Sequence, residues 1–179
     1  MMISRGQGRL LLPARPSFVI LSITVATVLQ IALLLIVGRN GVWVPDFLLL
    51  VLLHWVLATP RWINLGWAFF LGLCLDMLHY GLLGQHALAY VCMAALVLML
   101  GRRLPHFSTL EQVPQIWGVL VLGQIILVAA GVLASWTWPG WLVLCKPFIE
   151  AALWPLVVWL LQMPQRRAHD EDVHRPLAM

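Results

Sequence analysis

The segment GLCLDMLHYGLLGQHALAY, residues 72–90, places three side chains capable of chemistry in an otherwise apolar stretch. Asp76, His79 and His86 combine a carboxylate with two imidazoles, the groups that proteins use for metal coordination and proton transfer. A charge near hydrocarbon costs several kcal/mol unless it is paired, hydrated or neutralised. Asp76 therefore needs a specific partner, and the neighbouring elements must supply it.

Two further acids follow prolines closely. Pro45 directly precedes Asp46, and Pro147 lies three residues before Glu150. Proline suits the first helical position, because its missing N–H has no intrahelical partner to lose. Both acids then fall in a first helical turn, where the macrodipole favours an anion by about 0.3–1 kcal/mol. Lys146, four residues before Glu150, is close enough to pair with it. We expect helix-end electrostatics at both acids.

The sequence motifs argue against catalysis and against a bound metal. The chain contains no HExxH, CxxC, GxxxxGK[ST] or GxGxxG motif. It also offers no serine–histidine dyad and no second aspartate at the depth of Asp76 for intramembrane proteolysis. Cys74, Cys92 and Cys145 lie in apolar surroundings and are predicted to be buried thiols. We expect no enzyme activity, no cofactor and no metal site.

Composition places the chain in a membrane. It is 62% hydrophobic and 10% charged, with a mean hydropathy of +0.93, whereas a soluble domain has roughly 25% charged residues. A hydrocarbon core of about 30 Å needs around 20 apolar residues per helix. The predicted fold class is an all-α integral membrane protein with six transmembrane helices, at about 17–37, 45–59, 63–80, 85–101, 114–135 and 147–162.

These helices form one predicted membrane domain, residues 17–163, between a basic N-terminal segment (1–16) and a disordered tail (164–179). The first helix is predicted to be retained, because its apolar run is too long for a cleaved signal peptide. The segment LPHFSTLEQVP, between the fourth and fifth helices, is predicted to hold a short helix on the membrane surface.

The distribution of basic residues predicts the orientation. With six helices, nine of the eleven Lys and Arg residues lie on one side, and Arg39 and Lys146 lie on the other. The positive-inside rule then places both termini in the cytoplasm. The same topology accounts for the pI of about 9.5, and because the basic residues form no patch interleaved with aromatics, no nucleic-acid partner is expected.

On this topology Asp76 lies near the C-terminal end of the third helix, where the macrodipole disfavours an anion. Gly72, one turn earlier, allows another backbone to approach the same face, and Gly84 allows a sharp reversal into the fourth helix. We expect Asp76 to accept hydrogen bonds from N–H groups at the start of that helix, near Gln85 and His86. A direct contact of Asp76 with a ligand or a partner is the alternative.

Residues 45–90 resemble the MreD family of bacterial rod-shape-determining membrane proteins. The resemblance rests on the Pro-Asp opening of the second helix, on ATPRWINLGWAFFLGLCLD at 58–76, on LLGQHAL at 82–88 and on LWP at 153–155. Within these stretches the family's order is followed by Pro60, Asn64, Gly66, Gly72 and Asp76. At His86 many members are expected to have arginine, so an anionic contact there is pH-dependent in this chain.

The resemblance implies a non-enzymatic scaffold of the cell-elongation machinery, which synthesises peptidoglycan at the bacterial inner membrane. The partners implied are MreC, RodA with its penicillin-binding transpeptidase, indirectly MreB, and membrane lipids. The family is also similar in overall fold to the substrate-binding subunits of vitamin transporters. Gly66, Ala68 and Gly72 suit close packing, either with a partner's span or within the chain.

The alternative function is that of a membrane subunit that binds a small molecule or a lipid-linked precursor. Its binding site is predicted to be an outward-facing pocket lined by Asp76, His79, Glu150 and the tryptophans at positions 136, 138 and 141.

Overall fold

The computed structural model of the chain describes residues 15–38, 44–79, 83–101, 108–135 and 140–173, and all regular structure within these ranges is helical. The all-α prediction is therefore confirmed for this part of the chain. The described elements are α1 (Pro16–Val37), α2 (Phe47–Ala58), α3 (Leu65–His79), α4 (Gln85–Leu100), α5 (Thr109–Ser135), the 3₁₀-helix η2 (Trp141–Cys145) and α6 (Lys146–Val173).

Three helical stretches are long and apolar enough to cross a membrane, namely Pro16–Val37, Thr109–Ala134 and Trp141–Pro164. The apolar helices Phe47–Ala58, Leu65–Leu78 and Gln85–Leu100 are shorter. At 1.5 Å per residue the 12 residues of α2 rise roughly 18 Å, less than the thickness of about 30 Å of a hydrocarbon core. Helix length alone therefore does not establish six complete crossings.

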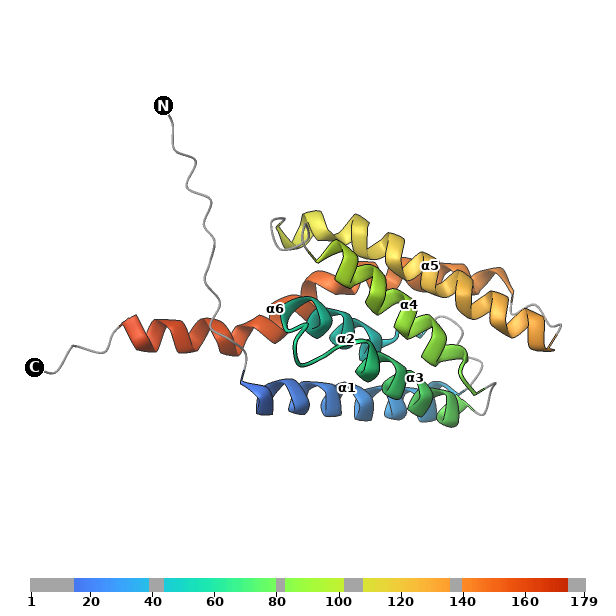
Figure 1. Ribbon diagram of the computed structural model, residues 1–179, viewed down its shortest axis with the longest axis horizontal. Helices are drawn as coiled ribbons and strands as arrows, with labels where there is room; N and C mark the ends of the chain where they lie inside the picture. The colour runs from blue at the N-terminus through green and yellow to red at the C-terminus, as the bar shows by residue number, and fades with distance from the viewer. Residues whose placement is uncertain (1–14, 39–43, 80–82, 102–107, 136–139, 174–179) are drawn as a thin grey trace, which may run out of the picture.

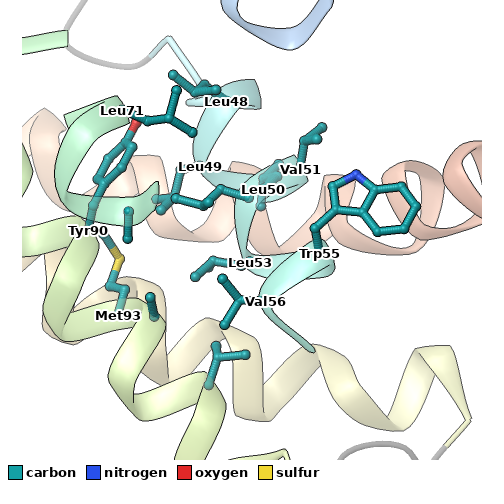
Figure 2. Packing of buried hydrophobic residues seen from close by; sticks show 14 of the residues in the cluster. Leu48, Leu49, Leu50, Val51, Leu53, Trp55, Val56, Leu71, Tyr90 and Met93 are labelled. Atoms are coloured by element: carbon teal, nitrogen blue, oxygen red, sulfur yellow. The ribbon is translucent and has the colours of Figure 1, made fainter. Parts of the chain in front are cut away.

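Helix α2 lies at the centre of the bundle (Figure 1), where it packs against α1, α4 and α6. Helix α3 packs on α4, α4 on α5, and α5 on α6. Every residue of α2 from Leu48 to Val56 is buried, as expected for a helix that is apolar on all sides and surrounded by others. Figure 2 shows Leu49, Leu53 and Val56 from this stretch together with Tyr90 and Met93 of α4.

The second helix begins two residues later than predicted. Helix α2 begins at Phe47, and Asp46 is its N-cap, because the Asp46 carboxylate accepts a hydrogen bond of 3.0 Å from the Leu49 N–H. Pro45 therefore lies before the cap and is not the first helical residue. Pro147 is the second residue of α6, one position later than predicted, because the helix begins at Lys146.

Helix α5, predicted to start at about residue 114, begins five residues earlier, at Thr109. The Ser108 N–H donates to Glu111 Oε2 at 2.9 Å, and the Gln112 N–H donates to the Ser108 carbonyl. The Ser-x-x-Glu spacing is that of a capping box, so residues 109–114 form the first turns of α5 and no separate surface helix. The beginning of that predicted surface helix, residues 104–107, lies outside the described residues.

Helix α6 extends beyond the predicted boundary and projects from the bundle (Figure 1). Residues 164–173 of the predicted disordered tail are helical, and residues 174–179 lie outside the described ranges. Beyond Pro164 the sequence QRRAHDEDV contains neither glycine nor proline, so nothing in it breaks the helix.

Candidate functional site

Asp76, in the last turn of α3, is enclosed by the beginning of α4. Its Oδ2 accepts hydrogen bonds from the N–H groups of Gly84 at 2.8 Å and Ala87 at 3.3 Å. Its Oδ1 accepts the His86 N–H at 2.8 Å and lies 2.8 Å from His86 Nδ1. The side chain is only 1% exposed. The predicted hydrogen bonds from the start of the fourth helix are therefore confirmed.

Asp76 acts as the N-cap side chain that α4 lacks. Gly84 occupies the cap position with φ of 99°, in the left-handed region that glycine tolerates, and has no side chain to accept the first free N–H groups. A carboxylate from α3 fills this role, and the N-terminal end of the α4 dipole stabilises its charge. His79 ends α3, and its side chain lies outside the described part of the chain.

Gly72 makes this contact possible. A Cβ added at Gly72 would lie 2.5 Å from Ala87 Cα and 2.8 Å from Ala87 N. No larger residue fits at this crossing, which brings α3 close enough to α4 for Asp76 to reach the N–H groups. Gly72 is thus used within the chain, which favours the intramolecular alternative for this residue over packing with a partner.

A second polar cluster joins the starts of α2 and α6. The Asp46 N–H donates to Glu150 Oε1 at 2.9 Å, and the Tyr90 hydroxyl of α4 donates to Asp46 Oδ2. Lys146 Nζ lies 3.7 Å from Glu150 Oε1, so the predicted pair is present. Asp46 and Glu150 are each 2% exposed. Helix-end electrostatics is therefore only part of their role, since both also make bonds between helices.

Gln30 connects α1 to this cluster. Its Oε1 accepts the Phe47 N–H at 3.1 Å, at the start of α2. Sequence reasoning missed both Gln30 and Tyr90. A single long polar side chain within the apolar run of α1 was a usable signal for Gln30, whereas nothing in the local sequence pairs Tyr90 with Asp46.

Two further polar residues, Asn64 and His54, have local roles. Asn64 Oδ1 accepts the Gly66 N–H at 3.0 Å on an exposed turn that begins α3. His54 is buried beside the rings of Trp55 and Trp154, with centroid distances of 5.2 and 6.3 Å.

None of the three cysteines is fully buried. Cys74 and Cys92 are half-buried and Cys145 is exposed, so the prediction of three buried thiols is wrong. Within the described ranges, no three His, Cys, Asp or Glu side chains converge to hold a metal ion.

The residues proposed for an outward-facing pocket are not all available to line one. Asp76 and Glu150 are buried and bonded to neighbouring helices, whereas Trp141 is 76% exposed. The tryptophans at 136 and 138 lie outside the described residues. Chemically, the two clusters satisfy the free N–H groups at the starts of α2 and α4 and hold α1, α3 and α6 against them.

Comparisons with known proteins give one consistent result. The profile of the family described as rod shape-determining protein MreD matches residues 14–164. The rod shape-determining protein MreD of Haemophilus influenzae (strain ATCC 51907 / DSM 11121 / KW20 / Rd) is 32% identical over 127 residues, covering 69% of this chain and 76% of that relative. No solved structure matches the chain.

Proposed function

The chain belongs to the MreD family of rod shape-determining proteins, and on this premise we propose that it is a non-enzymatic membrane scaffold of the machinery that elongates the cell wall. The observation that carries the proposal is the family match across residues 14–164, which includes all six helices up to Pro164.

The internal use of the polar side chains supports a scaffold. Asp46, Asp76, Glu150 and Gln30 are buried, and each accepts a backbone N–H that a helix start leaves free. Such bonds fix the positions of neighbouring helices, and the outer faces that remain are apolar. A rigid bundle with apolar outer faces suits lipid and the single spans of partner proteins.

We expect all six helices to span the bacterial inner membrane, with both termini in the cytoplasm. Hydrogen bonds join the starts of α2, α4 and α6 to the second half of α1 and the end of α3, which is the arrangement of helices that alternate in direction. The likeness to the substrate-binding subunits of vitamin transporters stays a prediction about the fold. Labelling of single cysteines placed near each terminus with a membrane-impermeant maleimide tests the orientation, and labelling from outside intact cells contradicts it.

The partners that we propose are MreC and RodA with its penicillin-binding transpeptidase, and through them MreB. Deletion of the gene in its own host is expected to turn rods into spheres, and a plasmid copy is expected to restore them. Rods that keep their shape after deletion contradict the proposed function. In the rescued strain, tagged MreC should recover the chain from solubilised membranes, and loss of recovery at equal membrane levels identifies variants whose binding surface is altered.

A further inference from the structure

An apolar groove of about 220 Å³ lies between α1 and α3. Helix α1 contacts the bundle mainly through α2, which leaves a gap beside α3. The groove runs along α1 from Ile20 to Val28, a rise of roughly 12 Å, and Trp67 and Leu71 of α3 form its other wall. This length fits within one leaflet, about half of the hydrocarbon thickness of about 30 Å.

Apart from the Trp67 indole N–H, the polar side-chain groups that line the groove are not free to bind a partner. Its two hydroxyls are already used within α1: Thr24 Oγ1 donates to the Ile20 carbonyl at 2.9 Å and Thr27 Oγ1 to the Ile23 carbonyl at 2.8 Å. The groove therefore suits an occupant that is pure hydrocarbon along its length.

Two exposed arginines, Arg15 and Arg61, precede the two helices that form the groove. Phe18 of α1 contacts the Trp55 ring of α2, with centroids 6.0 Å apart, and so fixes the two helices at the same level. Arg15 is the N-cap residue of α1, one turn before Phe18. Thr59 lies one turn beyond Trp55, and its N–H donates to the Trp55 carbonyl. Arg61 follows Thr59 by two residues. Both arginines are exposed. Arg15 immediately precedes α1 and Arg61 lies four residues before α3, and these two helices begin toward the same end of the bundle (Figure 1).

We propose that this site binds one anionic phospholipid, with an acyl chain in the α1–α3 groove and the phosphate between Arg15 and Arg61. The two positive charges favour a phospholipid over a partner's helix as the occupant, because an apolar helix has no anionic group for the two arginines to bind. Trp62, 68% exposed in the same turn as Arg61, lies where tryptophan favours the headgroup region. Basic residues beside a groove between transmembrane helices are the usual receptors of anionic headgroups. The proposal rests on the membrane-spanning arrangement and is independent of the role in cell shape.

Native mass spectrometry of the full chain in mild detergent, titrated with phosphatidylglycerol or phosphatidylcholine, tests the proposal. The wild-type chain is expected to bind phosphatidylglycerol more tightly. Arg15→Gln with Arg61→Gln should weaken phosphatidylglycerol binding by roughly 30-fold and leave phosphatidylcholine unchanged, whereas Arg15→Lys with Arg61→Lys should keep most of the preference. The matched control, Arg102→Gln with Arg103→Gln, removes two positive charges between α4 and α5 and should bind as the wild type does.

Filling the groove tests the acyl chain separately. Thr27→Trp should lower the retention of both lipids. If Thr27→Trp does not elute as a monodisperse protein, Val28→Trp is used in its place, because Val28 lies at the rim of the groove and is 60% exposed. The proposal is overturned if the two double Arg→Gln variants lose phosphatidylglycerol binding equally. It is also overturned if Arg15→Gln with Arg61→Gln binds phosphatidylglycerol as the wild type does. It is also overturned if filling the groove leaves lipid retention intact and instead abolishes co-purification of MreC, since the groove then holds a helix.

Discussion

The same substitution, glycine to alanine, should have opposite effects at two positions of this bundle. At Gly72 the new Cβ would lie 2.5 Å from Ala87 Cα, whereas carbon atoms in contact are normally about 3.5–4.0 Å apart. At Gly118 of α5 nothing lies within 4 Å of the added atom. Both glycines are inside helices, so the change in helix propensity is the same and only the surroundings differ.

The structure sets the expected magnitude. To accommodate alanine at Gly72, α3 and α4 must separate by roughly 1 Å, and the bonds of 2.8 Å from Asp76 to Gly84 and His86 lengthen with them. Overpacking costs about 1–3 kcal/mol, and each weakened hydrogen bond costs about 1 kcal/mol. Helix propensity returns about 1 kcal/mol. We expect Gly72→Ala to lower the free energy of unfolding by about 2–4 kcal/mol, and Gly118→Ala to raise it by up to about 1 kcal/mol.

Unfolding of the purified protein in dodecyl maltoside, titrated with sodium dodecyl sulfate and followed by tryptophan fluorescence, measures both changes against the wild type. If Gly72→Ala is as stable as the wild type or as Gly118→Ala, then α3 and α4 do not meet at Gly72 as the structure has them. The explanation of the Asp76 contact would fail with it, because that contact depends on the same close approach.

The other predictions concern the buried acids and are checked by the same titration. Asp76→Leu leaves three N–H groups without an acceptor, each costing about 1–3 kcal/mol when buried, so it should be less stable than Asp76→Asn, which keeps one acceptor oxygen; equal stabilities would contradict the capping role. Tyr90→Phe removes the hydroxyl donor to Asp46 and should lower the free energy of unfolding by about 1–3 kcal/mol; no change would mean that this bond is absent in the membrane. Glu150→Gln keeps an acceptor for the Asp46 N–H and loses only the pair with Lys146, whereas Glu150→Leu loses both. Glu150→Leu should therefore be the less stable variant, and the reverse order would refute the assignment.

The sequence by itself determined the class of the protein and much of its local structure. High hydropathy and the spacing of apolar runs predicted the ends of the helices to within about five residues, apart from the C-terminal end of α6. A helix in lipid must satisfy its own backbone hydrogen bonds, and hydropathy indicates where that happens. The contact of Asp76 was also predictable. Its donors follow within one short glycine-containing connection, so few other arrangements of the chain were open to it.

Tertiary structure alone decided the second cluster. Asp46 is bonded to Tyr90 and Glu150, which lie 44 and 104 residues away in sequence. Which helices bring these residues together depends on the packing of the whole bundle, and no local pattern encodes that packing. The same holds for α2, whose apolar run predicts a helix but whose burial on all sides follows from its neighbours. Partners close in sequence were predictable because the connection limits where they can be, whereas distant partners were fixed only when α1, α4 and α6 had packed around α2.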